Sequence, residues 1–242
     1  MEAIMALYYQ DEHVTLYHGD CLTGHREWLN ADVLVTDPPY GIGHRHSRTT
    51  GKTKEERLAN SRKKQAEGTE RISGDKTTEA RDKAIDAWGD RPGLVFGAWR
   101  APRPKRVCQR LLWVKADPGT GLAGEKTHPW VSKDEEIYVL ASSMSEFGMS
   151  GVHSNVYITS EARGAEVKRI GHPTPKPLTL MEQLVRKCPP GVVADPFAGS
   201  GATLIAARNL GRKAIGVELE EKYCEIIAKR LDQQVIDFDS LV

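Results

Sequence analysis

An acidic side chain, two prolines and a tyrosine stand together at Asp37-Pro38-Pro39-Tyr40, directly after the apolar run of residues 31–36. The β-branched residues of that run predict a buried strand, and the prolines must end it because proline cannot donate to a sheet ladder. Since proline also fixes φ, the carboxylate, the free carbonyl of Pro38 and the tyrosine ring would share one small arc. Such an arc can grip a flat ring that carries an amino group. The alternative is an ordinary strand end with a packing tyrosine.

A second group of residues points to a cofactor. The buried strand predicted over residues 191–195 runs into a turn with Gly199 and Gly201, followed by a helix over 202–209. Glycines let the backbone approach a ligand closely at a helix N-terminus. The next strand ends at Glu218, where an acid can bind the two hydroxyls of a ribose. The pattern predicts a nucleoside-cofactor site; an α/β protein with a glycine turn and no cofactor is the alternative.

Two common phosphate-binding fingerprints do not fit this turn. A nucleotide P-loop needs Gly-Lys-Ser/Thr, whereas Gly201 is followed by Ala202 and Thr203. The dinucleotide fingerprint requires a third glycine at the position of Leu204. A nucleoside cofactor held by neither arrangement is therefore expected.

Two further segments have both a functional and a plain structural interpretation. Asp20 follows the strand predicted over residues 14–18, and ligands of open α/β sheets lie outside such strand ends, although Asp20 could equally cap the next turn. Residues 172–177 (His-Pro-Thr-Pro-Lys-Pro) precede an amphipathic helix over 178–186. A proline-rich entry with a threonine cap would explain that segment without any function.

In this order, the motifs at 37–40, 172–177 and 195–201 resemble those of the amino-group DNA methyltransferases, which methylate the exocyclic nitrogen of adenine or cytosine. Because the catalytic motif precedes the cofactor motif, the chain is most similar to their circularly permuted β group. The resemblance implies a Rossmann-like S-adenosylmethionine-dependent methyltransferase fold. In this α/β fold, a mostly parallel sheet carries helices on both faces.

The resemblance also implies a role for each matched residue. Asp37 and the carbonyl of Pro38 would accept hydrogen bonds from the amine of a flipped base, with Pro39 stiffening the turn and Tyr40 stacking on the base. Glu218 would hold the ribose of S-adenosylmethionine, and Asp20 would face its adenine amine. The other cofactor-binding residues implied are His172, Thr174, Lys176, Asp195, Phe197, Ala198, Gly199, Ser200 and Gly201.

Adenine N6 is the expected target, because the cytosine-N4 members of the family mostly carry serine at the position of Asp37. Cytosine N4 is the alternative. Methylation at cytosine carbon 5 needs a Pro-Cys nucleophile, and the chain has only the reverse order Cys188-Pro189. Enzymes acting on RNA or protein amides generally place the Pro-Pro-Tyr turn after the cofactor motif. A catalytically silent nucleic-acid-binding protein of this fold would not need Asp37, Tyr40 and Glu218.

Two segments depart from the family pattern and are candidates for contact with double-stranded DNA. Residues 41–75 are long, polar and basic, which predicts a mobile loop that orders on phosphates, with a merely solvated loop as the alternative. Residues 142–171 predict a small target-recognition insertion. The DNA-binding candidates are Arg45, Arg48, Lys52, Arg62, Lys63, Lys64, Lys168 and Arg169.

Length and composition limit the remaining possibilities. The 242 residues suit one methyltransferase domain spanning 1–242, and the formal net charge of +1 requires any basic surface to be local. Four scattered cysteines suggest neither a metal site nor disulfides. No apolar run reaches the length of a membrane span, and no signal peptide is visible, so a cytoplasmic location is expected. A homodimer and a cognate restriction nuclease are the other partners considered.

Overall fold

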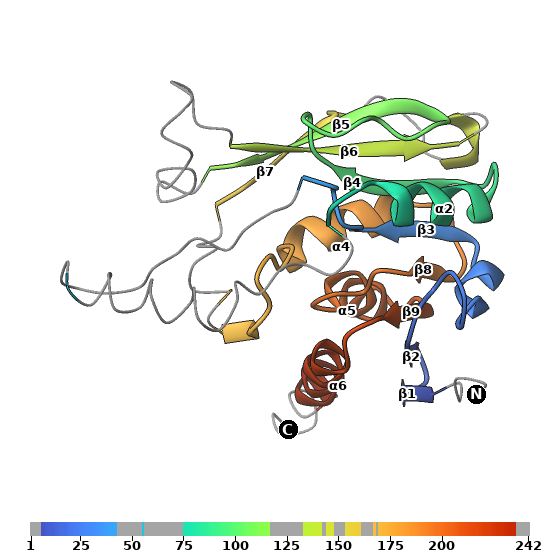
Figure 1. Cartoon of the computed structure of the whole chain (residues 1–242), viewed down its shortest axis with the longest axis vertical. Helices are drawn as coiled ribbons and strands as arrows, with labels where there is room; N and C mark the ends of the chain where they lie inside the picture. The colour runs from blue at the N-terminus through green and yellow to red at the C-terminus, as the bar shows by residue number, and fades with distance from the viewer. Residues whose placement is uncertain are drawn as a thin grey trace.

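The computed structural model describes residues 6–42, 55, 75–116, 133–141, 144–147, 153–160, 167 and 169–235. These residues form a nine-stranded sheet with the strand order β1-β2-β9-β8-β3-β4-β6-β5-β7 (Figure 1). The strands are β1 (Ala6–Gln10), β2 (Val14–His18), β3 (Val33–Thr36), β4 (Gly93–Gly97), β5 (Val107–Lys115), β6 (Asp134–Leu140), β7 (Val156–Thr159), β8 (Val193–Asp195) and β9 (Ala214–Glu218).

Five consecutive strands of this sheet, β2, β9, β8, β3 and β4, run parallel. Their carboxyl ends therefore meet at one edge, which is where ligands bind in open α/β sheets. The pairs β1–β2, β4–β6 and β5–β6 are antiparallel, and β7 lies parallel to β5. The prediction of a mostly parallel α/β sheet is confirmed.

Helices cover both faces of the sheet, as expected. They are α2 (Glu79–Trp88), α4 (Leu178–Lys187), α5 (Ala202–Asn209) and α6 (Glu221–Val235), with 3₁₀ turns η1 (Glu27–Asn30) and η2 (Met144–Phe147). On one face, Trp28 of η1 stacks on Trp88 of α2 with ring centroids 5.9 Å apart. The opposite face is covered by α4, α5 and α6, whose buried residues belong to one apolar cluster.

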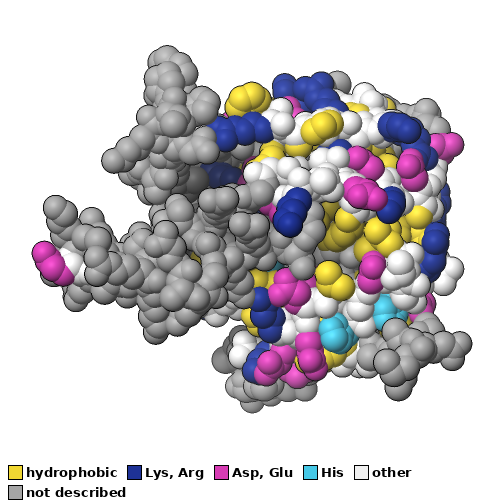
Figure 2. Space-filling view, in the orientation of Figure 1, with side chains coloured by type: hydrophobic (Ala, Val, Ile, Leu, Met, Phe, Trp, Pro, Cys, Tyr) yellow, Lys and Arg dark blue, Asp and Glu magenta, His cyan; other side chains and the backbone are white. Residues whose placement is uncertain are grey.

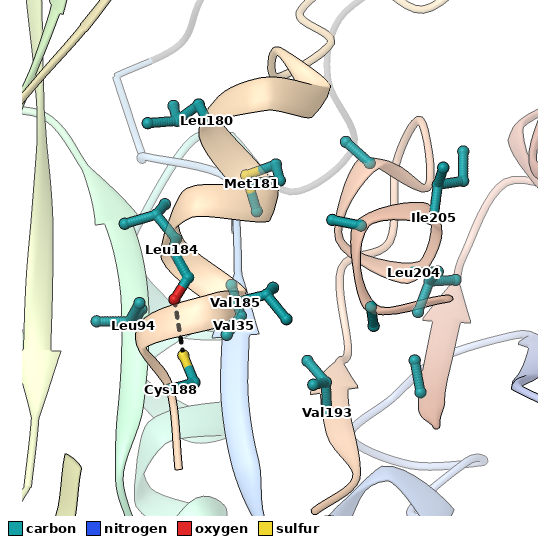
Figure 3. Packing of buried hydrophobic residues seen from close by; sticks show 14 of the residues in the cluster. Val35, Leu94, Leu180, Met181, Leu184, Val185, Cys188, Val193, Leu204 and Ile205 are labelled. Atoms are coloured by element: carbon teal, nitrogen blue, oxygen red, sulfur yellow. Dashed lines mark hydrogen bonds between the residues drawn. The ribbon is translucent and has the colours of Figure 1, made fainter. Parts of the chain in front are cut away.

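The amphipathic pattern of α4 explains how it packs. Its buried residues Leu180, Met181, Leu184 and Val185 recur at helical spacing and form one apolar stripe. Figure 3 shows this stripe between β3 and β4 on one side and α5 on the other. Helix α4 thereby fixes the segment that precedes it, residues 172–177, against the carboxyl edge of the sheet.

Some element boundaries differ from those expected. The strand predicted from residue 31 begins at Val33, and the Asp32 carboxylate just before it accepts a hydrogen bond of 2.7 Å from the Val192 amide. The sequence pattern had not indicated β1 or α6. Among the strands that the structure describes, β1 lies at the edge of the sheet and pairs with β2.

The four cysteines form no disulfide, and three of them are buried. Burial raises the pKa of Cys21, Cys188 and Cys224 to about 12. Cys108 on β5 is exposed, and its Sγ donates to the carbonyl of Val139 at 3.3 Å. Within the described residues, no helix has the length and apolar character needed to cross a membrane, and no group of His, Cys, Asp and Glu could hold a metal ion.

Candidate active site

The parallel strands bring four predicted site residues to the carboxyl edge of the sheet. Asp20 follows β2, Asp37 follows β3, Asp195 ends β8 and Glu218 ends β9. The order β2-β9-β8-β3 places these strand ends side by side. Residues from two distant parts of the chain thus share one edge.

Asp195 anchors the glycine turn. Its Oδ1 accepts hydrogen bonds from the Thr36 hydroxyl at 2.6 Å and from the Phe197 amide at 3.2 Å. Burial raises the pKa of Asp195 to about 6. Because Thr36 directly precedes Asp37, this contact ties the cofactor motif to the catalytic motif.

The glycine turn itself is tight. Gly199 and Gly201 have φ angles of +52° and +76°, a region that side chains rarely adopt. A Cβ at Gly201 would lie 2.8 Å from Cγ1 of Ile227 in α6. Ala198 and Ser200 are buried within the same turn, and Phe197 is partly buried.

Glu218 closes this turn from β9. Its Oε2 accepts from the Gly199 amide at 2.7 Å, and its Oε1 accepts from the Glu220 amide at 2.8 Å. Burial raises the pKa of Glu218 to about 7. A carboxylate has four acceptor sites, so both oxygens retain capacity for the hydroxyls of a ribose.

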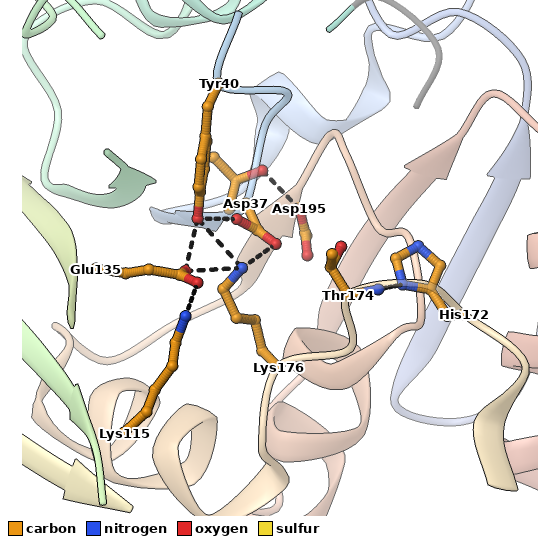
Figure 4. A network of polar contacts seen from close by, with 9 residues as sticks. Asp37, Tyr40, Lys115, Glu135, His172, Thr174, Lys176 and Asp195 are labelled. Carbon is orange, nitrogen blue, oxygen red and sulfur yellow. Dashed lines mark hydrogen bonds and ion pairs between the residues drawn. The ribbon is translucent and has the colours of Figure 1, made fainter. Parts of the chain in front are cut away.

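The catalytic motif lies at the centre of a polar network (Figure 4). Asp37 Oδ1 accepts from the Tyr40 hydroxyl at 2.8 Å, and Oδ2 accepts from Lys176 Nζ at 2.5 Å. Pro38 is buried and Pro39 is partly buried. Burial, followed by the charges of Asp37 and Glu135, raises the pKa of Tyr40 well above its usual value, so its phenol keeps the proton.

The segment 172–177 reaches both motifs. The ring of His172 would lie 3.2 Å from a Cβ at Gly199, and its Nδ1 accepts from the Thr174 amide at 3.3 Å. Lys176 lies further in, where its ammonium contacts Asp37 and the Tyr40 hydroxyl. The structure therefore places Lys176 against the catalytic motif, a contact that the sequence did not predict.

Two residues of the network were missed by the sequence analysis. Glu135 Oε2 lies 2.9 Å from the Tyr40 hydroxyl and 3.3 Å from Lys176 Nζ, and its Oε1 pairs with Lys115 Nζ. Glu135 and Lys115 occupy the ends of β6 and β5, on the sheet face whose other members are the buried residues Trp113 and Ile137. A charged residue at the end of an otherwise apolar strand face was the sequence signal that could have identified these two residues.

Asp20 has the capping role that was the alternative interpretation. It is exposed, and its carboxylate accepts from the Leu22 amide at 2.8 Å and the Thr23 hydroxyl at 3.0 Å. The contact with a cofactor adenine stays a prediction.

Of the DNA-binding candidates, only Arg169 lies within the described residues, and it is exposed. The other candidates, Arg45, Arg48, Lys52, Arg62, Lys63, Lys64 and Lys168, and most of the predicted loop 41–75 lie outside them. Figure 2 shows Lys and Arg side chains over β5 and β6 and acidic side chains around α6. By sequence, exposed cations near the start of β5 are Arg100, Arg103, Lys105 and Arg106, which precede the strand, and Arg110, which lies on it. Arg106 pairs with Asp86 and Asp90, and Arg103 and Arg110 pair with Glu136, so part of this positive charge is neutralised locally.

The arrangement of strands and helices is that of the Rossmann-like S-adenosylmethionine-dependent methyltransferases. The crystal structure of an M1.HpyAVI–SAM complex superposes with a TM-score of 0.57 at 21% identity, covering 90% of this chain and 99% of that one. The cytosine-N4-specific PvuII DNA methyltransferase gives a TM-score of 0.59 at 16% identity, covering 99% of this chain and 91% of that one. At these identities, the two structures establish the fold.

Sequence similarity establishes the family. A family model described as DNA methylase, of the N6/N4 type, matches residues 113–229. The protein named "Putative methylase YubD" of Escherichia coli strain K12 is 47% identical over 220 residues, which cover 83% of this chain and 81% of YubD. The chain belongs to the N6-adenine/N4-cytosine DNA methyltransferase family.

Proposed function

We propose that the protein transfers a methyl group from S-adenosylmethionine to the exocyclic N6 of adenine at specific sites in double-stranded DNA. The observation that carries this proposal is the Asp37 carboxylate, oriented by Tyr40 and Lys176 beside the turn that Asp195 and Glu218 hold. A carboxylate that can accept a hydrogen bond from an amine thus lies next to a site suited to a nucleoside cofactor. This arrangement suits the transfer of a methyl group from the cofactor to the amine.

S-adenosylmethionine, the cofactor of this fold, supplies a methyl group on a positively charged sulfur. The residues at the carboxyl edge fit it: the tight turn at Gly199 and Gly201 lets backbone amides approach a ligand, and the buried Glu218 presents a carboxylate to a ribose. We assign Asp20 and Phe197 to the adenine end, and His172 and Thr174 to the methionine end.

The chemical problem is the weak nucleophilicity of an exocyclic amine, whose lone pair is delocalised into the base. In our proposal, Asp37 and the Pro38 carbonyl accept hydrogen bonds from the amine and favour a tetrahedral nitrogen. Bound S-adenosylmethionine would supply its methyl group in line with this nitrogen, the electron pair of the broken carbon–sulfur bond remaining on sulfur. Asp37 would hold the amine for the attack, and the proton released from the methylated amine would pass to the Asp37 carboxylate and from there to solvent. Catalysis then rests on orientation and electrostatics.

The target amine lies inside a duplex, so the base must be flipped out. Unstacking costs a few kcal/mol, which contacts in the pocket must offset. Tyr40 is the proposed stacking residue, and its ring must turn a face to the base while the hydroxyl stays near Asp37. The Pro38-Pro39 turn limits the movement of this ring by fixing the backbone between them.

Cytosine N4 is the second candidate target, because its amine has the same chemistry and the cytosine-N4-specific PvuII enzyme shares the fold. Asp37 favours adenine through the family resemblance described above. We further propose one methyltransferase domain over residues 1–242 with the β-group motif order. A basic DNA-contacting loop near 41–75, a recognition insertion near 142–171, a homodimer, a cognate restriction nuclease and a cytoplasmic location complete the proposal.

The test is incubation of the purified chain with unmethylated duplex DNA and S-adenosylmethionine labelled in its methyl group. Nucleosides are then separated and identified by mass spectrometry. Labelled N6-methyladenine is the expected product. Labelled N4-methylcytosine would retain the mechanism and correct the base, and cofactor binding with no labelled nucleoside would contradict the proposal.

A further inference from the structure

Two lysines and two carboxylates form a closed cluster beneath the catalytic motif. Lys176 contacts Asp37 at 2.5 Å and Glu135 at 3.3 Å, and Lys115 pairs with Glu135. The side chains of Lys176, Lys115 and Glu135 are only 7%, 11% and 12% exposed. Unpaired charges at such burial would be costly, whereas this cluster carries two positive and two negative charges and is neutral.

The sheet register explains how this cluster forms. Glu135 on β6 pairs with Trp113 on β5, so Lys115 lies two residues further along the same face, in reach of Glu135. Lys176 arrives from the segment before α4, and its ammonium lies 4.9 Å from the centre of the Phe96 ring and 6.0 Å from that of Trp113. Residues on β3, β5, β6 and the α4 segment therefore meet at one point.

Glu135 competes with Asp37 for the same two donors. The Tyr40 hydroxyl lies 2.8 Å from Asp37 and 2.9 Å from Glu135, and a hydroxyl has a single proton to donate. Lys176 has three protons and contacts both carboxylates at once. Without the Glu135 charge, both donors would be drawn to Asp37 alone, and the direction of its carboxylate towards the substrate amine would change.

We propose that Glu135, held in place by Lys115, is a positioning residue for methyl transfer. By sharing Lys176 and the Tyr40 hydroxyl, it fixes the direction of the Asp37 carboxylate, whose remaining acceptor sites then face the amine. This inference rests on the proposed function, because it assigns Asp37 to the amine. In that function Glu135 is assigned no contact with substrate or cofactor, so its effect is expected on the rate of transfer and not on cofactor affinity.

The test compares Glu135→Gln with the wild type under saturating cofactor and DNA. Glutamine keeps the shape and removes the charge. We expect kcat to fall about 10- to 100-fold, the scale of a misplaced reacting group, while Kd for S-adenosylmethionine stays near its wild-type value. Tm should fall as well, because Lys115 loses its buried counter-charge, so kcat is measured well below the Tm of the variant. Asp134→Asn is the matched control, because successive strand residues point to opposite faces and residue 134 points away from the cluster. Its kcat should be unchanged.

A second pair of variants separates positioning from folding. Lys115→Met alone removes one of the two lysines that pair with Glu135, whereas Lys115→Met combined with Glu135→Gln removes both charges of that pair. We expect the double variant to lose no more activity than Glu135→Gln alone. Glu135→Gln with wild-type kcat, or additive losses in the double variant, would overturn the inference.

The failure of this inference can be distinguished from that of the proposed function. A wild-type protein that methylates no DNA contradicts the proposed function itself. A wild-type protein that methylates DNA, together with a fully active Glu135→Gln variant, contradicts only the role of Glu135. Should Glu135→Gln fail to fold, Glu135→Asp tests the position of the charge instead, because it keeps the charge but shortens its reach to Lys176; wild-type kcat in that variant would contradict the positioning role.

Discussion

The cofactor motif and the catalytic network lie on one edge of the sheet but are built differently. In the cofactor motif, the Gly199 amide and the Glu218 carboxylate that bonds it are 19 positions apart. In the catalytic network, Lys176 and Asp37 are 139 positions apart, and Tyr40 and Glu135 are 95. The cofactor motif therefore lies within a single βαβ unit. The catalytic network joins residues from distant strands and can form only when the whole sheet has formed.

The two regions also differ in their charge. Asp195 and Glu218 are buried acids bonded by backbone amides and hydroxyls, and burial raises their pKa values to about 6 and 7. In the network, each carboxylate has a lysine partner. Among the described residues, the acids of the cofactor motif thus have no lysine partner and can accept hydrogen bonds from a ligand. In the catalytic network, the carboxylates are already paired with lysines.

If the regions act independently, substitutions should separate chemistry from cofactor binding, and Asp37→Ala should have the largest effect. Loss of a preorganised acceptor is expected to lower kcat about 10³-fold, with S-adenosylmethionine binding retained. Label transfer to DNA and equilibrium cofactor binding measure the two quantities. Intact methyl transfer in this variant would remove Asp37 from the mechanism.

Glu218→Gln should have the opposite effect. Loss of the charged acceptor for the ribose hydroxyls is expected to raise Kd for S-adenosylmethionine about 10- to 100-fold, whereas kcat at saturating cofactor changes little. Isothermal titration calorimetry and steady-state kinetics give both values. A fall in kcat with unchanged Kd would mean that the two regions are coupled.

Gly201→Ala should destabilise the fold by about 1–3 kcal/mol, because the residue has positive φ and its new methyl group would meet Ile227. Gly211→Ala is the matched control. Gly211 also has positive φ, at +67°, but a Cβ there meets nothing within 4 Å. Chemical denaturation measures both, and equal losses would show that the contact between the turn and α6 contributes nothing.

The smallest effect is expected from pH. A carboxyl whose pKa is raised on folding contributes stability below its unfolded pKa and loses it as pH rises through the folded value. Ionisation of Glu218 should therefore lower Tm as pH rises from about 5 to about 8. The same ionisation should strengthen cofactor binding over this pH range. In Glu218→Gln, the fall in Tm should be smaller. Equal slopes in the two proteins would contradict the assignment of this titration to Glu218.

The difference between the regions explains what the sequence could predict. The strand, turn, helix and acid around residues 193–218 follow from local periodicity and glycine placement, and the structure has the helix at the predicted residues 202–209. Asp37 and Tyr40 were recognisable as a compact motif. Glu135 and Lys115 were not, because their proximity depends on the register of β5 against β6 and on the crossing of the α4 segment.

Individual side-chain contacts were likewise harder to predict from the sequence than the position of a residue in its element. Asp20 could be placed at the end of β2 from its sequence alone, but which partners its carboxylate takes depends on the turn of residues 20–24. Lys176 was expected beside the cofactor, and its contact with Asp37 results from the way α4 packs on the sheet. Long-range packing, not local propensity, decides such contacts.

The exposed thiol of Cys108 gives this chain a natural attachment point for a fluorophore. The other three cysteines are buried with pKa values near 12, so maleimide reagents would modify Cys108 selectively at mildly alkaline pH, its own pKa also being raised by burial. Lys115 lies seven positions further along the same extended strand, about 23 Å away. Energy transfer from such a dye to labelled oligonucleotides would report the approach of DNA in real time, without any engineered substitution.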